Sequence, residues 1–282
     1  MGEYRDRLEQ ELRLRGYSEK TVKAYVLQVK RLVKHFMRSP DELSAAEIRE
    51  YLVHVTEVEK LAPATINQAI FAIRFFYREI LDRPWEEKFT CRRRGPVRLP
   101  TVLTSSEVSR LLAAAKNQKH RVLMMVLYSA GLRLNEALSL EPRDIEVEEE
   151  RIRIRCAKGG RERYVMLSQR LLEELRVYVR QQPRGRFLFP GRTPGSALGS
   201  SAVQRMVRGM GKRAEITKKV TPHVLRHSFA THLVEQGTNL LYVQTLLGHR
   251  DLKTTLNYTR VARQGATRVL SPLDTLENPI EA

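Results

Sequence analysis

The apolar residues of the first 88 positions follow the three-to-four-residue period of amphipathic helices. Gly16 ends a short first helix, and Ser18 is placed to cap a longer second one. The sequence SAAE, beginning at Ser44, is a capping box that opens a third helix, and a fourth follows Pro63. Residues 1–88 are therefore predicted to form a small helical bundle.

The helical period stops at residues 89–103, most of which read FTCRRRGPVRLP. Arginine, proline and glycine at this density, without an apolar period, indicate an extended basic linker between two domains. Arginines in this linker, with one from a later turn, are candidate phosphate contacts of a nucleic-acid-binding protein. These residues are Arg92, Arg93, Arg94, Arg98 and Arg161.

Beyond the linker, residues 104–282 change their period once. TSSE at Thr104 is a second capping box, and further helices follow it. RIRIRC, from Arg151, alternates like a half-buried strand, and YVMLS returns after a turn, which predicts a β-hairpin. Helices resume at Ser168, and a tail begins at about residue 261. The expected fold class is mainly α with a small β-hairpin or sheet (α+β).

Charge is the feature of the composition that changes the picture. The 282 residues include 50 Lys and Arg against 32 Asp and Glu, a formal net charge of +18. This excess favours a polyanionic partner, with nucleic acid first. The longest apolar run, residues 122–128, is too short to cross a bilayer, so no membrane partner is expected. The chain has two cysteines, whose spacing fits no metal site, and its N-terminal segment is charged, so we expect a cytoplasmic protein. Binding to DNA would associate such a protein with the nucleoid.

Four separated segments carry candidate chemistry. GLRLNE offers an arginine and a glutamate, the turn KGGRER a lysine, HVLRHS a histidine and an arginine, and LGHRDLKTTLNYT a histidine and a tyrosine. The candidate site residues are Arg133, Glu136, Lys158, His223, Arg226, His249 and Tyr258. Because the set holds no metal-ligand motif and no nucleotide-binding loop, neither a metal nor another cofactor is expected.

This set of side chains suits transfer of a phosphodiester. Two guanidiniums can bind its non-bridging oxygens, and Tyr258 can attack phosphorus to give a 3′-phosphotyrosyl link and a free 5′-hydroxyl. We expect His223 to assist loss of the phenol proton, Lys158 to protonate the leaving oxygen, and Glu136 to buttress the site by hydrogen bonding. Because threonines and an asparagine surround Tyr258, we also expect its hydroxyl to be exposed for attack.

Each of these residues alone also suits a structural role at a helix end or in a solvated turn. Residues 231–249 have the small residue, central glycine and later apolar positions of a helix-turn-helix, so a non-catalytic DNA-binding regulator is an alternative. A metal site at His223, His227 and His232 is disfavoured, because no carboxylate or cysteine joins them.

The segments GLRLNE, KGGRER, TPHVLRHSFATHL, LLGH and TTLNYT, in this order, resemble the signatures of the tyrosine recombinase (phage integrase) family. The resemblance covers nearly the whole chain. It implies that the candidate arginines, lysine, histidines and tyrosine form the active site, with Glu136 as their acidic companion. It also implies an N-terminal SAM-like core-binding domain and a C-terminal catalytic domain that hold duplex DNA from both sides.

The same resemblance implies a reaction and an assembly. Members cut and rejoin double-stranded DNA at an inverted-repeat core site through a Holliday junction, with a dimer on each site and a tetramer in the synapse. The chain is most similar to the compact Xer and integron-integrase branch, although residues 178–220 are too short for the extra segment of integron integrases. Chromosome dimer resolution, integration or excision of a mobile element, and cassette exchange all fit. A type IB topoisomerase would use the same chemistry without a synapse and remains a further alternative.

Overall fold

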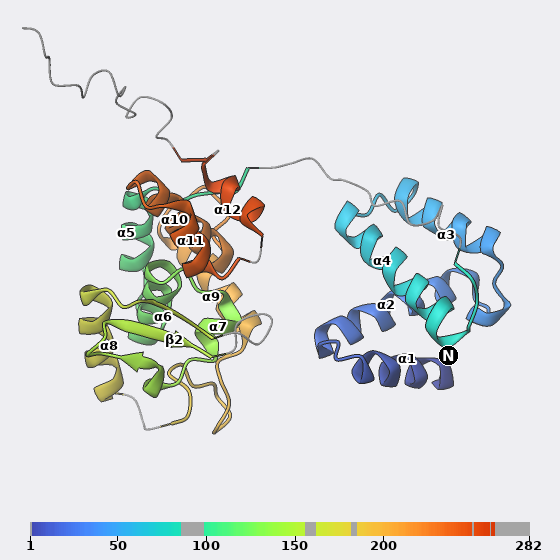
Figure 1. The fold of residues 1–282 in the computed structure, drawn as a ribbon, viewed down its shortest axis with the longest axis horizontal. Coiled ribbons are helices and arrows are strands. Elements are labelled where there is room, and N and C mark those ends of the chain that lie inside the picture. The colour runs from blue at the N-terminus through green and yellow to red at the C-terminus, as the bar shows by residue number, and fades with distance from the viewer. Residues whose placement is uncertain are drawn as a thin grey trace, which may run out of the picture. The chain divides into compact units, whose positions relative to one another are not determined.

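Helices and one small sheet form the protein, and the computed structural model describes residues 2–85, 99–155, 162–181, 185–249, 251–259 and 261–262. The chain divides into two compact units, residues 1–97 and 98–282 (Figure 1). The mainly α fold class with a small sheet is confirmed. The predicted linker and the tail lie largely outside the described residues, so their boundaries stay predictions. Among the helices that the structure describes, none is long and apolar enough to cross a membrane.

Helix caps fix where helices of the first unit begin. The Ser18 hydroxyl accepts a hydrogen bond from the Thr21 amide, and Ser44 and Glu47 form the reciprocal capping box that the sequence predicts. The elements of this unit are α1 (Gly2–Leu14), α2 (Glu19–Phe36), a 3₁₀ turn (Pro40–Glu42), α3 (Ala45–Glu57), α4 (Pro63–Phe75) and a π-helical turn (Phe76–Ile80).

The apolar faces of these helices meet in one core, in which α2 packs along α4. Fully buried side chains of this core include Leu12, Leu32, Ile73 and Phe76. Their burial stabilises helices that are too short to be stable alone. The single tryptophan of the chain, Trp85, packs against the same core and reports on this unit.

The second unit is built around α6, whose residues Val122 to Leu127 are all buried. Helices α8 and α10 both pack on α6. The helices of this unit are α5 (Ser105–Ala113), α6 (Gln118–Ser129), α7 (Leu134–Leu138), α8 (Gln169–Gln181), α9 (Ser200–Arg213), α10 (Pro222–Glu235), α11 (Leu240–Leu247) and α12 (Leu252–Thr259). A capping box at Thr104 opens α5, as predicted.

The predicted hairpin forms two strands of a three-stranded antiparallel sheet. The strands are, in order, β1 (Ile145–Glu146), β2 (Arg151–Ile154) and β3 (Arg163–Met166). Ile152 pairs with Val165, and both side chains are buried, which explains the alternation seen in the sequence. The two-residue strand β1 is too short to leave such a pattern and was not predicted.

The turn after α6 depends on a glycine. Gly131 has a φ of +59°, and a Cβ at this position would lie 2.2 Å from Cδ1 of Phe229 on α10. This close approach allows the Gly131 carbonyl oxygen to accept a hydrogen bond of 2.6 Å from Nη1 of Arg226. Gly131 therefore sets the distance between this turn and α10.

We expect Gly131→Ala to lower the free energy of unfolding of the second unit by about 2–4 kcal/mol, because alanine adds left-handed backbone strain and a steric clash. Gly195→Ala is the matched control, since Gly195 has a φ of +74° but no described atom within 4 Å of an added Cβ. Its cost should be the backbone strain alone, about 1–2 kcal/mol. Urea unfolding followed by circular dichroism measures both, while the Trp85 fluorescence transition should stay unchanged. Equal losses would rule out the clash.

Candidate active site

The carboxylate of Glu136 is the centre of the candidate site. Its side chain is 4% exposed and lies in the first turn of α7, whose N-cap residue is Arg133. The backbone amide and Nη1 of Arg133 each donate a hydrogen bond of 2.8 Å to it. Arg163, at the start of β3, donates two more, of 3.0 Å from Nη1 and 2.7 Å from Nη2. Arg226 of α10 lies 3.9 Å from the same carboxylate.

These guanidiniums keep Glu136 ionised at a position where burial opposes charge. Burial alone would raise the pKa of Glu136, but the hydrogen bonds and charge of Arg163, followed by the hydrogen bonds of Arg133, hold this pKa at about 2. One negative charge therefore faces three positive ones, and the site keeps an excess of positive charge.

The same arginines also bind the C-terminal end of α11. Three consecutive carbonyl oxygens accept one guanidinium each: Leu246 from Nε of Arg163 at 2.9 Å, Leu247 from Nη2 of Arg226 at 2.6 Å, and Gly248 from Nη2 of Arg133 at 3.0 Å. A helix end leaves such carbonyls without intrahelical partners, and the helix dipole favours cations there. Gly248, with a φ of +61°, ends α11 in the left-handed conformation that favours glycine.

Arg226 and Arg133 differ in their access to solvent. The Arg226 side chain is 4% exposed, and burial, followed by the charge of Arg133, lowers its pKa to about 10. The Arg226 guanidinium therefore remains charged at neutral pH. The Arg133 side chain is 27% exposed, so a bound anion can reach it from solvent.

The two predicted histidines are neutral at pH 7. Burial, then the charges of Arg226 and Arg133, lowers the pKa of His223, and the same causes lower that of His249 to about 4. Nδ1 of His249 lies 3.0 Å from Oγ1 of Thr255 on α12, and this contact ties the segment after α11 to the helix that bears Tyr258.

Tyr258 is buried, so the expected exposure of its hydroxyl is wrong. The residue is 2% exposed, and its hydroxyl lies 3.1 Å from Nδ1 of His227 on α10. Thr255, one turn earlier, is also fully buried. The polar residues around Tyr258 led to a wrong prediction of solvent exposure, because this face of α12 packs against histidines inside the fold. Burial raises the pKa of Tyr258, although the charge of Arg226 partly opposes it.

Comparison with known proteins agrees with this geometry. The model of the phage integrase family matches residues 101–264, and that of the phage integrase N-terminal SAM-like domain matches residues 4–87. The chain belongs to the phage integrase family. Tyrosine recombinase XerA of Pyrococcus furiosus is 32% identical over 279 residues, which cover 95% of this chain and 93% of XerA. An integrase/recombinase of Escherichia coli is 33% identical over an alignment of 315 positions, which covers 96% of this chain and 93% of the relative.

A solved structure supports the same assignment. The crystal structure of XerH site-specific recombinase bound to its difH substrate matches with a TM-score of 0.72 at 25% identity, and covers 90% of this chain and 81% of XerH. These relatives confirm the predicted function of a tyrosine site-specific recombinase. They do not favour the topoisomerase or the regulator.

The structure brings six of the predicted site residues of this recombinase into one region of the second unit. They are Arg133, Glu136, His223, Arg226, His249 and Tyr258. Their individual roles remain predictions. The other predicted residues lie outside the described part of the chain, namely Lys158 and the candidate phosphate contacts Arg92, Arg93, Arg94, Arg98 and Arg161.

Two residues of the site, Arg163 and His227, were not among the predicted site residues. Arg163 lies two positions before the buried Val165 on β3, so the strand alternation already put an arginine on the inward face. His227 follows Arg226 directly and was considered only as a metal ligand. Among the described residues, no group of three or more His, Cys, Asp or Glu is placed to hold a metal ion.

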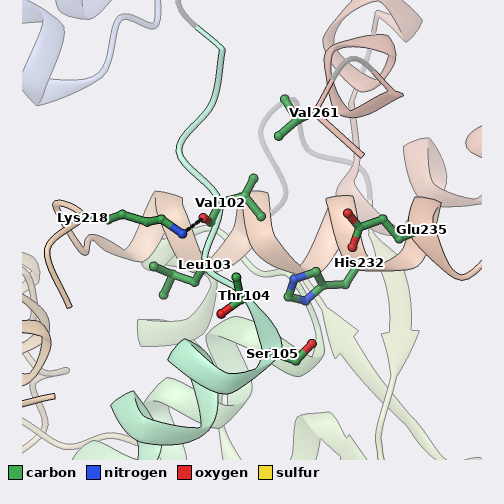
Figure 2. A pocket seen from close by; sticks show the side chains of 8 residues that line it. All are labelled: Val102, Leu103, Thr104, Ser105, Lys218, His232, Glu235 and Val261. Atoms are coloured by element: carbon green, nitrogen blue, oxygen red, sulfur yellow. Dashed lines mark hydrogen bonds between the residues drawn. The ribbon is translucent and has the colours of Figure 1, made fainter. Parts of the chain in front are cut away.

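A cavity of about 350 Å³ lies elsewhere, between the start of the second unit and the C-terminal half of α10 (Figure 2). Val102 and His232 line it, and Nζ of Lys218 donates to the Val102 carbonyl oxygen at 2.9 Å. None of the predicted site residues that the structure describes lines this cavity. It is therefore separate from the candidate active site.

Glu136 should make the stability of the second unit depend on pH. A pKa held at about 2 in the folded protein, against 4.5 for a free side chain, stabilises the fold above pH 4.5. This contribution, up to about 3 kcal/mol, is lost as the pH falls from about 4.5 to 2. We therefore expect Glu136→Gln to be least stable relative to wild type at neutral pH, with a difference that shrinks in acid.

Urea unfolding at pH 7, 4 and 3 measures this difference. Glu162→Gln is the control, because Glu162 forms an exposed pair with Arg153 and should change stability by less than about 1 kcal/mol at each pH. A Glu136→Gln deficit that stays constant across this range would show that the carboxylate does not titrate as described.

Proposed function

We infer that Arg133 and Arg226 bind the scissile phosphodiester of duplex DNA and that Tyr258 attacks it. The Tyr258 oxygen forms a bond to phosphorus, the bond from phosphorus to the 5′ oxygen breaks, and a 3′-phosphotyrosyl link and a 5′-hydroxyl result. Attack by the 5′-hydroxyl of a second strand reverses these steps and releases the tyrosine. One observation carries this proposal. The buried Tyr258 packs beside Arg133 and Arg226, whose guanidiniums are held in place around the carboxylate of Glu136.

The electrostatics of the site support binding of a phosphodiester. Glu136 offsets only part of the positive charge of Arg133, Arg163 and Arg226, so the remaining positive charge favours binding of a phosphodiester anion. The hydrogen bonds to Glu136 and to the end of α11 fix the guanidiniums before DNA arrives. Donors that need no reorganisation stabilise a transition state most effectively.

The burial of Tyr258 implies a movement on DNA binding. A residue that is 2% exposed cannot reach a phosphorus atom held outside the fold. Helix α12 has eight residues, and the bond between His249 and Thr255 holds it to the segment after α11. We therefore expect α12 to shift slightly as the DNA backbone enters, so that the phenol oxygen reaches the bound phosphate while it stays within hydrogen-bonding distance of α10.

The remaining roles follow from the family resemblance. Lys158 protonates the 5′ oxygen as it leaves, and His249 and His223 contact the phosphate or the nucleophile. The arginines of the linker and Arg161 add phosphate contacts outside the active site. The net charge of +18 favours such contacts.

Assembly on DNA completes the proposed function. The structure of XerH contains its difH substrate. This similarity supports double-stranded DNA as the substrate of the present protein. We infer a dimer on each inverted-repeat core site, a synaptic tetramer that exchanges strands through a Holliday junction, and a place of action at the nucleoid in the cytoplasm. Each protomer then supplies one Tyr258.

Tyr258→Phe should bind DNA as wild type does yet form no covalent adduct, because only the attacking oxygen is removed. The substrate is a nicked duplex that carries an inverted-repeat site selected by binding from a random-sequence library. Denaturing gels detect the adduct, and gel shifts detect binding. Tyr242→Phe, at an exposed tyrosine, is the control that should react normally.

An adduct of normal yield with Tyr258→Phe would remove Tyr258 from the nucleophile role. A wild-type protein that binds a specific site without forming any adduct would instead revive the regulator. Cleavage by monomers at most sequences would revive the topoisomerase.

A further inference from the structure

His227 is the hydrogen-bond partner of the Tyr258 hydroxyl within the described residues. Its Nδ1 lies 3.1 Å from this hydroxyl, and the two rings are 5.7 Å apart at an angle of 50°. His227 follows Arg226 directly on α10, so the backbone that places the arginine also places this imidazole. The sequence predicts that His223 takes the proton of Tyr258, but the His223 ring stacks on that of His227 with the ring centres 6.3 Å apart.

The chemistry of the nucleophile needs a proton acceptor at this place. A phenol has a pKa of about 10, and burial raises that of Tyr258 further. The hydroxyl must therefore lose its proton during attack, and the acceptor has to lie within hydrogen-bonding distance. His249 stacks on the Tyr258 ring at 6.2 Å, but its own Nδ1 faces Thr255 at 3.0 Å. Geometry thus favours His227 over both predicted histidines.

We propose that His227 is a catalytic residue that accepts the Tyr258 proton through Nδ1 as the phosphotyrosyl bond forms. This step rests on the proposed function above. The proton moves from the phenol oxygen to Nδ1, the oxygen bonds to phosphorus, and the 5′ oxygen leaves with a proton from a separate acid. In religation the attacking 5′-hydroxyl gives its proton back to the separate acid, and the His227 imidazolium returns its proton to the phenol oxygen, so the enzyme ends unchanged.

The surroundings of His227 couple this step to DNA. His223 and Arg226 face it from α10, Tyr258 from α12, and His249 from the segment after α11. Burial, followed by His223 and Arg226, lowers the pKa of His227 to about 4, so it is a weak base in the free protein. A phosphate bound at the arginines offsets their charge and favours the imidazolium. Tyr258 therefore keeps its proton until DNA occupies the site.

The test separates proton transfer from hydrogen bonding. His227→Asn keeps an amide group near the position of Nδ1, which can accept a hydrogen bond but cannot take up a proton. We expect its single-turnover cleavage of the nicked duplex to fall about 100-fold or more, as for loss of a general base. Cleavage within about threefold of wild type would overturn the proposal, since hydrogen bonding alone would then suffice.

A second substrate identifies which proton is affected. In a duplex with sulfur in place of the bridging 5′ oxygen, the thiolate leaves without being protonated, so loss of the general acid no longer matters. His227→Asn should stay defective on this substrate, whereas Lys158→Ala should recover. Recovery of His227→Asn would assign His227 to the leaving group and overturn the proposal.

A matched control lies on the same helix. His232 lines the separate cavity (Figure 2). Its Nδ1 is 2.8 Å from the Tyr128 hydroxyl. His232→Asn makes the same change in another histidine–tyrosine pair, which does not include the nucleophile. This variant should therefore cleave at the wild-type rate. If His227→Asn loses binding to one half-site, His227→Ala takes its place, because it also removes the proton acceptor and should be defective on both substrates. Absence of any wild-type adduct would contradict the proposed function, whereas equal adducts from wild type and His227→Asn contradict this inference alone.

Discussion

The buried carboxylate of Glu136 is the group on which the candidate active site of this recombinase depends. Arg133 and Arg163 bind it directly, and Arg226 lies 3.9 Å away. Without a negative charge among them, three guanidiniums in a buried place would repel one another and lose much of their hydration. A neutral amide would retain some hydrogen bonds but would leave the positive charge unbalanced. The carboxylate of Glu136 thus compensates the charge of arginines at a position where too little solvent is present to do so.

The end of α11 provides the second half of this frame. Its last carbonyl oxygens bind the same guanidiniums, so segments far apart in sequence are fixed by one set of charged hydrogen bonds. The residues that follow, His249 and then α12 with Tyr258, take their position from this helix end. His227, Tyr258 and the arginines around Glu136 therefore share one support. A preorganised site of this kind is how an enzyme places fixed dipoles around developing charge.

The sequence predicted those parts of the molecule that short-range patterns determine. Caps at Ser18, Ser44 and Thr104 set helix starts from a few neighbouring residues, and the alternation from Arg151 indicated the hairpin. The motifs indicated the chemistry. The contact of Arg163 with Leu246 spans 83 positions, and no local period reports such a contact.

The burial of Tyr258 was missed for a related reason. Its threonine and asparagine neighbours suggest solvent when the helix is considered alone, yet His227 and His249 supply polar partners inside the fold. A polar helix face can be buried when the opposite surface is also polar. Only the tertiary arrangement of α10, α11 and α12 reveals this match.

The central claim is that phosphoryl transfer occurs at the tyrosine packed beside the arginines organised by Glu136. The most direct measurement is mass spectrometry of the covalent adduct after nuclease and trypsin digestion. Trypsin cuts after Lys253 and Arg260, so the account predicts a 3′-nucleotide on the peptide TTLNYTR, attached to Tyr258. Attachment to any other side chain, with TTLNYTR recovered unmodified, would contradict it.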